Sequence, residues 1–572
     1  MVCHATAVAG PLILAVALRL INLGTNPGWD GDEGYNYNIA LNLAHGHRQM
    51  FALSFAFVQH PPLFFLLAAG LFHLLGASMF TLRVLSILCS LGTLLLLRPL
   101  AYELVCWRPS VRNPLGSPAS RRHAVAATGL ARGDTTARAD GAGKMLAVSG
   151  GPSADVAGQA PAVPGGPSAG RAWDGDAPDG HGGGARRMAE RIALLSMLAY
   201  AVTPLVVLQN RFGYTYNGLA LWTALALLAV LRYRRTGAQG ALVLSGVATA
   251  LALTTDQEGM YLAPVLLFGL AGASLARRAL ACALALAGPA LYVGAMALAD
   301  PSALVFDVTH TAGRVAGGPL SRQAAALLYY LADLLRFDPI IPLGLAGLAL
   351  VPYRPARRLL LGLLAAMLLV ILKVRDPNPL FRTAEPLLPL VCLGLGTLGA
   401  ALWGRVGATR RSGGAVAVAL FVLMVTGAAV TYDAWSALTR FPTRIGGLLP
   451  RSTADAAAMA GWLNRRLHPA DVVIAMPQVS WTLRARTTEL LQAVAYHGQA
   501  SAFYPAGIAR RRWRYDVGID AARFLVVDDF TRAWIAENGP ERALVAPARR
   551  AWTPVYIHGE YTIYENPAHA HY

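Results

Sequence analysis

The chain has 572 residues, of which 55% are hydrophobic and 14% charged, and its mean hydropathy is +0.45. This composition excludes a water-soluble globular protein and favours a polytopic membrane protein. The net charge of +18 does not indicate nucleic-acid binding, because the arginines fall mainly in short loops between apolar segments, in a polar insert and near the C-terminus.

The first predicted element is an apolar segment at residues 5–23, which at about 20 residues is long enough to span a membrane. The loop that follows, residues 24–62, begins with three carboxylates: Asp30, Asp32 and Glu33. Apolar and aromatic residues at helical spacing then predict a short interfacial helix up to Ala44, with the acidic residues at its positive end. A solvated acidic turn flanked by glycine is the alternative.

The same loop ends in His60-Pro61-Pro62-Leu63, directly before the next apolar segment. An acidic pair, an aromatic-bearing helix and a His-Pro-Pro-Leu box together resemble the first external loop of polyprenyl-phosphate-sugar glycosyltransferases. This family includes the protein O-mannosyltransferases and the lipid A aminoarabinose transferase. The resemblance implies the multi-span fold called GT-C, with Asp32, Glu33 and the box at the matching positions.

Residues 61–77 and 79–101 are both apolar, and the side of every later loop depends on whether both cross the membrane. The first holds about 15 apolar residues after two prolines, which is short for a span. We therefore predict a juxtamembrane or partly inserted helix there, so that residues 1–106 form the N-terminal membrane segments with one crossing in this pair.

Residues 107–187 are rich in Gly, Ala, Pro, Ser, Arg and Asp and have almost no large apolar side chains. Such a stretch cannot bury enough surface to offset its ordering entropy, so we predict a disordered cytoplasmic linker. A regulatory or partner-binding insert is the alternative reading.

Residues 188–433 are predicted to form the transmembrane domain. Its apolar segments lie near 191–208, 217–231, 239–255, 259–275, 279–299, 340–352, 358–372, 384–403 and 414–432. The predicted total is about 11 transmembrane helices, and this count puts the arginine-rich connectors on the cytoplasmic side, as the positive-inside rule requires.

The same count places a second group of polar segments on the external side with the acidic loop: 209–216, 256–259, 300–338 and 373–382. The aromatic turn containing Arg211 and the segment entered at Arg382 resemble further parts of the same family. Lys373 is one of two lysines among 49 basic residues, and an ammonium suits a phosphate contact at a membrane surface. A lysine that only snorkels at the end of a span would look the same.

Residues 434–572 change in character and are predicted to form an external α/β domain. A capping box at Ser452 to Asp455 opens a helix, residues 471–475 and 524–527 read as buried strands, and 553–565 read as a hairpin around His558-Gly559. Asp528 and Asp529 end a strand and are predicted to lie in a surface turn, with a ligand site as the alternative.

The resemblance implies an integral membrane glycosyltransferase that moves a sugar from a polyprenyl-phosphate donor to an acceptor hydroxyl at the outer face of the cell membrane. This chemistry needs a carboxylate base and cations that balance the departing phosphate. The sequence offers Asp32 as the base with Glu33 or Asp30 as its neighbour. The candidates for the phosphate are His60, Arg211, Lys373, Arg375 and Arg382. A divalent cation is compatible with this chemistry but not required by it, and the acceptor is a lipid, a glycan or a protein.

Two other classes of protein have similar hydropathy. A transporter should show an internal hydropathy repeat, and none is visible between the two halves of the chain. A membrane polymer-assembly or binding protein would explain residues 434–572, but it leaves the pairing of the acidic loop with the His-Pro-Pro-Leu box to chance.

The first prediction concerns topology. If the count is right, a cysteine placed near Arg138 is cytoplasmic and one placed near Trp513 is external. Labelling of intact cells with a membrane-impermeant thiol reagent should therefore modify the second position alone, and labelling of the first would overturn the assignment of sides.

Overall fold

The structure is a computed structural model that describes residues 2–25, 28–47, 60–105, 181–315, 324–325, 328, 340–373, 385–406, 453–501 and 503–570. Most of the predicted linker, the predicted span at 414–432, Arg375 and Arg382 lie outside these residues. One boundary differs from the prediction, since helix α6 begins at His181, inside the range predicted as linker.

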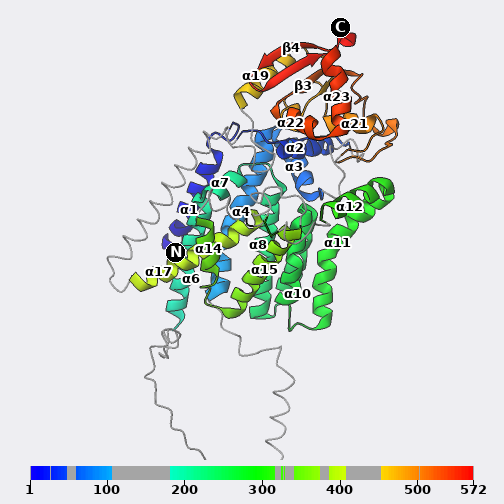
Figure 1. Ribbon diagram of the computed structural model, residues 1–572. Helices are drawn as coiled ribbons and strands as arrows, with labels where there is room; N and C mark the ends of the chain where they lie inside the picture. Colours follow the sequence, from blue (N-terminus) through cyan, green and yellow to red (C-terminus); the bar gives the residue numbers. More distant parts are fainter. Residues whose placement is uncertain are drawn as a thin grey trace, which may run out of the picture. The chain divides into compact units, whose positions relative to one another are not determined.

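The longer helices come from the apolar segments of the sequence (Figure 1): α1 (Val2–Leu20), α4 (Met79–Val105), α6 (His181–Val202), α8 (Thr215–Thr236), α9 (Gln239–Thr255), α11 (Leu275–Ala299), α15 (Arg354–Lys373) and α17 (Leu388–Val406). Helix α8 packs on α4 and α9, and α9 packs on α11. Buried leucine, valine and alanine side chains fill the space between them, such as Leu94, Leu227 and Ala248.

Four helical segments of the described chain are long and apolar enough to cross a membrane: 79–105, 215–236, 275–299 and 385–404. A fifth is added if α6 and α7 (Pro204–Asn210), which meet at a bend of 63°, count as one span. Several expected spans are shorter helices, so the total of about 11 stays a prediction.

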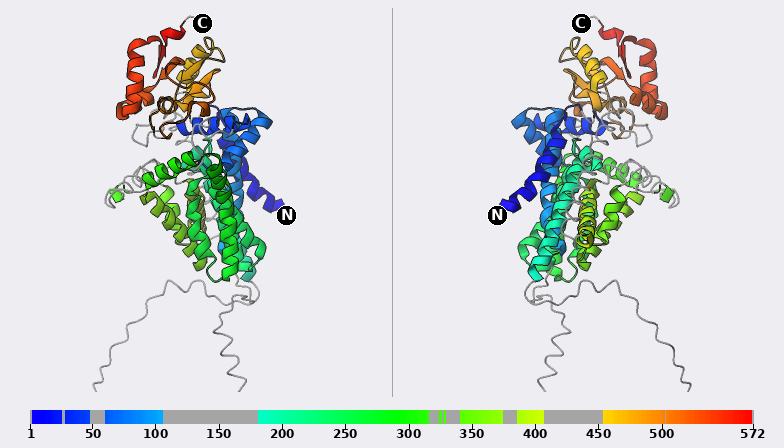
Figure 2. Two further views of the ribbon diagram at one scale, coloured as in Figure 1. Left: turned by 90° about the vertical axis from the view of Figure 1, so that its right-hand side faces the viewer. Right: turned by 90° about the vertical axis from the view of Figure 1, so that its left-hand side faces the viewer.

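The shorter helices are α2 (Gly31–Ala44), α3 (Leu63–Leu75), η2 (Gln257–Tyr261), α10 (Leu262–Gly269), α12 (Pro301–Val315), α14 (Ile340–Leu348) and η3 (Glu385–Leu387). Helix α3 has 13 residues, in line with a segment too short to span. The apolar segment at 259–275 does not form one helix but is divided between η2 and α10. Helix α12 turns away from the direction of α11, as Figure 2 shows.

The C-terminal region contains a five-stranded mixed sheet in the order β2-β1-β3-β5-β4. Its strands are β1 (Val472–Ile474), β2 (Arg486–Thr488), β3 (Ala522–Val527), β4 (Thr553–His558) and β5 (Tyr561–Glu565). Strand β1 is parallel to β2 and β3, whereas β5 is antiparallel to β3 and β4. The predicted strands and hairpin are confirmed, with Gly559 at a φ of +55° in the hairpin turn.

Helices cover both faces of this sheet, so consecutive side chains of β3 from Phe524 to Val527 are all buried. Phe524 and Val526 pack with α19 (Thr453–Asn464) on one face. Leu525 and Val527 pack on the other face with α21 (Leu490–Tyr496), α22 (Asp529–Glu537) and α23 (Gly539–Ala551).

The predicted surface turn after β3 is wrong. Asp528 is 1% exposed and is the N-cap of α22, where its Oδ1 accepts hydrogen bonds from the backbone N–H and the hydroxyl of Thr531 at 2.7 and 2.5 Å. Its Oδ2 accepts a hydrogen bond from the side-chain amide of Gln478 at 2.6 Å. The residue types that favour a turn are also those that cap a helix, and a helix follows here.

Candidate functional site

The acidic turn, residues 28–33, opens helix α2 as the sequence predicts. Asp30 is the N-cap, and its Oδ1 accepts a hydrogen bond from the backbone N–H of Asp32 at 3.0 Å. Asp32 and Glu33 lie in the first turn of the helix, where the unpaired N–H groups and the helix dipole stabilise negative charge. The helix ends at Ala44, followed by Gly46 in a left-handed conformation with a φ of +74°.

Glu33 is completely buried and forms a two-bond ion pair with Arg83 of α4. The Nε and Nη2 atoms of Arg83 donate to the two carboxylate oxygens at 2.7 and 2.6 Å. Arg83 also donates to the backbone carbonyl of Leu23 at 2.6 Å and to that of Gly28. This arginine, which the sequence analysis did not single out, therefore fixes both the acidic helix and the chain that leads into it.

The turn before α8 closes over the same carboxylate. The backbone N–H of Gly213 donates to Oε1 of Glu33 at 2.8 Å, and the side-chain amide of Asn36 donates to the carbonyl of Gly213 at 2.8 Å. A Cβ atom at Gly213 would lie 2.5 Å from the side chain of Leu82, which would have to shift to admit a larger residue. The predicted meeting of the acidic loop with the 209–216 segment is thus present in the structure.

The hydroxyl of Tyr214 donates a hydrogen bond to the other buried carboxylate, that of Asp30. Burial, with the negative charges of Asp30 and Glu33, raises the pKa of Tyr214 well above its usual value, so the hydroxyl keeps its proton and remains a donor. Asp30 itself is 0% exposed. Of the three clustered acids, Asp32 is the one that is half-buried rather than fully buried, which leaves it the most accessible to a substrate.

A third polar segment, residues 256–258, joins the same region. The hydroxyl of Thr215 donates to Oδ2 of Asp256 at 2.7 Å, and the backbone N–H of Glu258 donates to its Oδ1 at 2.9 Å. Burial raises the pKa of Asp256 to about 6. Of the polar segments predicted to share one face, those at 28–36 and 256–258 both form hydrogen bonds with the segment at 209–217.

The residues predicted to bind the donor phosphate differ in their burial and contacts. Arg211 is 1% exposed, and its two terminal nitrogens donate to the carbonyls of Leu18 and Ile21 at the end of α1, at 2.7 and 2.5 Å. Arg211 would have to leave these carbonyls at the end of α1 before it could bind a phosphate. Its contact with the phosphate stays a prediction. His60 is half-buried with its ring 6.0 Å from that of Phe65.

Lys373 is the last residue of α15, and Arg375 and Arg382 lie outside the described residues. In the part of the chain that the structure describes, no group of three or more His, Cys, Asp and Glu side chains is arranged to hold a metal ion. The predicted phosphate contacts of Lys373, Arg375 and Arg382 therefore remain predictions.

A polar network that the sequence analysis missed lies between α1, α4 and α7. Arg19 is 0% exposed and donates to the hydroxyl of Ser90 at 3.0 Å and to Oδ1 of Asn210 at 2.8 and 3.1 Å. Asn210 in turn donates to Asn217 at 2.7 Å and to Oε1 of Glu385 at 3.2 Å. A lone arginine near the end of an apolar segment was the available sequence signal, since a charge at membrane depth needs partners.

The C-terminal domain packs directly on the acidic helix. Helix α20 (Pro477–Ser480) contacts α2, and a Cβ atom at Gly34 would lie 2.0 Å from the carbonyl oxygen of Pro477. Only glycine permits so close an approach. Trp29, next to the acidic turn, belongs to the core of this domain and stacks edge-on against Trp481 with ring centroids 4.8 Å apart.

A buried carboxyl group of the domain also reaches α2. Glu489 is 4% exposed, and its carboxyl group accepts hydrogen bonds from the hydroxyls of Tyr504, at 2.8 Å, and of Tyr35. Burial raises the pKa of Glu489 to about 8, although these two hydrogen bonds act in the opposite direction. At neutral pH this carboxyl group is therefore mostly protonated.

The fold is that of known structures, although no family model matches the sequence and no curated protein is similar to it. ArnT from Cupriavidus metallidurans superposes with a TM-score of 0.60 both in the apo state and bound to undecaprenyl phosphate. The chain has the fold of ArnT. Sequence identity is 15% and 14%, and the alignments cover 99% and 98% of both chains. The oligosaccharyltransferase AglB from Archaeoglobus fulgidus gives a TM-score of 0.49 at 12% identity, over 99% of this chain and 74% of that chain.

The ArnT likeness confirms the predicted resemblance and fold class, a polytopic α-helical membrane protein of the GT-C type with a C-terminal α/β domain. Because the identity is low, the likeness concerns the fold, and it assigns no role to an individual residue. The roles predicted for the acidic and basic side chains are taken up below as proposals.

The buried ion pair gives a prediction about stability. Arg83→Met leaves Glu33 as an unpaired buried carboxylate, and loss of one partner of such a pair costs about 3–5 kcal/mol. We expect the variant to melt at a clearly lower temperature in detergent. Arg98→Met, a half-buried arginine of the same helix without an ion pair in the described residues, is the matched control. Equal melting temperatures for the two variants would contradict a structural role of the pair.

The pKa of Glu489 gives a second prediction. Between its ordinary value of 4.5 and about 8, the carboxyl group ionises in the unfolded chain while the folded chain keeps the proton, so the folded state loses stability as the pH rises through this window. The Glu489→Gln variant has no carboxyl group to ionise and does not lose this stability. The difference between its melting temperature and that of the parent should therefore grow in its favour from pH 5 to pH 8. Asp520→Asn, an exposed acid of the same domain, should track the parent, and a constant offset between Glu489→Gln and the parent would refute the shift.

Proposed function

We propose that this protein is a membrane glycosyltransferase that moves a sugar from a polyprenyl-phosphate donor to an acceptor hydroxyl, with Asp32 as the general base. The proposal rests on the contacts and exposure of the three clustered acids in a chain with the fold of ArnT. Glu33 is held by Arg83 and Gly213, Asp30 is held by Tyr214 and the helix N-terminus, and Asp32 keeps an exposed part.

The reaction needs little more than these groups. The anomeric carbon loses its bond to the phosphate oxygen and gains one to the acceptor oxygen, while the acceptor proton passes to a carboxylate. Asp32 would take the proton. The leaving polyprenyl phosphate departs as an anion without an acid, provided that cations stabilise its charge. His60, Lys373, Arg375 and Arg382 are the proposed sources of that charge, together with Arg211 if it can leave its carbonyl partners.

Two further facts support the donor class and the location. The ArnT structure was determined with undecaprenyl phosphate bound, a lipid of the class that the sequence resemblance implies. The described helices include four that are long and apolar enough to cross a membrane. We place the acidic turn and the C-terminal domain on the external face, following the distribution of arginines between the loops.

Neither the sugar nor the acceptor is part of the proposal. The alternatives are a membrane polymer-assembly or binding protein and a transporter. Neither alternative transfers a sugar, so an assay of sugar transfer separates both from the proposed enzyme.

The test is substitution of Asp32. Asp32→Asn keeps the size and hydrogen-bonding capacity of the side chain but removes its basicity. Sugar transfer from a synthetic polyprenyl-phosphate donor should therefore fall by about 10² or more while donor binding survives. Hydrolysis of the donor in the absence of acceptor should fall in parallel, because water must also be deprotonated.

The neighbouring acids provide the comparison. Glu33→Gln should fail through loss of stability, measured as a lower melting temperature, rather than through a purely catalytic defect. An Asp32→Asn protein that folds, binds donor and transfers sugar at the parent rate would remove Asp32 from the mechanism and make Asp30 the next candidate.

A further inference from the structure

Helix α12 exposes an apolar face and buries an acid. Ala303 and Asp307, four residues apart on one side of the helix, are both buried. Val305 and Val308 lie on the opposite side and are 65% and 50% exposed. A helix whose outer side meets water has the reverse pattern, with its charged residues outside and its apolar residues inside. The outer side of α12 is therefore suited to lipid rather than to water.

The position of α12 in the chain agrees with a lipid contact. The helix follows directly on α11, which is long and apolar enough to cross a membrane and is only 17% buried over its apolar stretch. Leu298, in the last turn of α11, is 90% exposed. Helix α12 then leaves the direction of α11 (Figure 2). The exposed valines thus come directly after the end of a helix that faces lipid.

Exposed apolar side chains are otherwise divided between the two parts of the protein. In the described C-terminal residues, 453–501 and 503–570, Ile557 is the one large apolar side chain that is exposed, whereas the helices before residue 407 expose many. Those helices belong to the membrane part, where lipid covers such side chains. Their exposed valines therefore group α12 with the helices that contact lipid, and not with the C-terminal domain.

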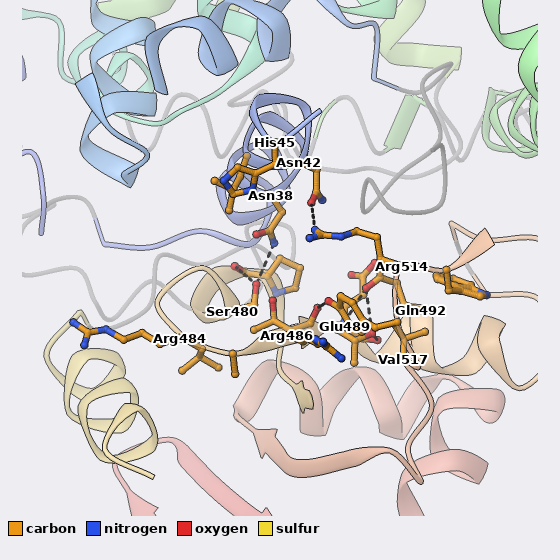
Figure 3. A pocket seen from close by; sticks show the side chains of 18 of the residues that line it. Asn38, Asn42, His45, Ser480, Arg484, Arg486, Glu489, Gln492, Arg514 and Val517 are labelled. Carbon is orange, nitrogen blue, oxygen red and sulfur yellow. Dashed lines mark hydrogen bonds between the residues drawn. The ribbon is translucent and has the colours of Figure 1, made fainter. Parts of the chain in front are cut away.

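An arginine-rich segment of the C-terminal domain contacts the start of α12. Arg512 forms an ion pair with Asp300, the residue between α11 and α12, and Trp513 packs in one apolar cluster with residues of both helices. Arg514 donates to Oδ1 of Asn42 on α2 at 3.1 Å, as the dashed line in Figure 3 shows. These contacts connect α2 with the start of α12.

Two arginines that precede these contacts are available to a ligand. Arg510 and Arg511 are exposed and form no ion pair in the part of the chain that the structure describes. Arg510 lies over the ring of Tyr496, with its guanidinium carbon 5.3 Å from the ring centroid, which leaves its N–H groups free to donate. Because Arg512 is bound where α11 ends, both side chains lie close to the level at which that helix leaves the membrane. Lipid phosphates lie at this level, and a guanidinium binds them well.

We propose that the exposed face of α12 and the pair Arg510–Arg511 form one surface that rests on the bilayer. The valines enter the boundary between headgroups and acyl chains, and the two guanidiniums bind the phosphates of anionic phospholipids. Since Arg514 of the same segment contacts α2, the bilayer contact reaches the helix that carries Asp32. The surface would bind lipid in this way whether or not the chain transfers a sugar.

Photo-cross-linking of the full chain in nanodiscs tests the contact. The bilayer contains a phosphatidylcholine with a diazirine at the start of one acyl chain, and mass spectrometry locates the adducts. Peptides of α12 should be modified, as should those of α11, where Leu291 and Leu298 are exposed. Helix α19, whose Ala457 and Ala458 are exposed, should not be modified. Modification of α11 without α12 would rule out the lipid contact.

The arginines are tested with a photoreactive phosphatidylglycerol in competition with the phosphatidylcholine. One basic residue at a membrane surface favours an anionic lipid by about fivefold. We therefore expect phosphatidylglycerol adducts on α12 to exceed those of phosphatidylcholine by about fivefold or more at low salt. This excess should disappear in the Arg510→Gln/Arg511→Gln variant, while the labelling of α11 stays unchanged and shows that the variant is inserted. Arg511→Gln alone, with a smaller loss, takes the place of a double variant that does not fold.

Arg549→Gln/Arg550→Gln is the matched control, because Arg549 also lies over a tyrosine ring, that of Tyr564 at 5.9 Å, and Arg550 is also exposed. This pair ends α23, which packs on α21 and α22, so the control should keep the excess of phosphatidylglycerol. Equal labelling by the two lipids in the parent would refute the assignment of Arg510 and Arg511 to anionic lipids. The same excess in the parent and in the Arg510→Gln/Arg511→Gln variant would refute it as well.

Discussion

The ion pair between Glu33 and Arg83 is the interaction on which the acidic turn depends. Removing two charges from water costs several kcal/mol for each ion, and the pair is tolerable only when hydrogen bonds satisfy both groups. Here the carboxylate receives three N–H donors and the guanidinium reaches two backbone carbonyls. The same bonds join α4, the start of α2 and the turn before α8. Asp32 consequently projects from a backbone that is held on both sides.

The C-terminal domain packs against the acidic turn and helix α2 and helps to hold them in place. Trp29 lies one residue before the helix cap and is buried in the domain's core, and Gly34 touches the backbone at Pro477. A shift of the domain would therefore move the first turn of α2, where Asp30 and Asp32 lie. On the proposed function, the domain and the membrane helices position the base together, so neither part is expected to work when supplied alone.

Much of this arrangement follows from local patterns in the sequence. The α2 helix, the buried strands β1 and β3 and the hairpin were predictable because their apolar spacing is set within a few residues. Strand β2 was missed because its three residues are polar and only Thr488 is buried, whereas the three residues of β1 are all apolar and buried. Arg83 and Arg19 were missed for a different reason, since their partners lie 50 and up to 191 residues away in the chain. No periodicity encodes such contacts, and Asp528 was misread because a turn and a helix cap favour the same residues.

Helix α2 carries two contrasting uses of charge. At its start the carboxylates are matched by a guanidinium, a tyrosine hydroxyl and backbone N–H groups, so the folded chain already satisfies them. Further along, Arg514 donates to Oδ1 of Asn42 and is exposed, so water and salt stabilise its charge. On the proposed function, the matched charges at the start of the helix are the ones that hold the base in place.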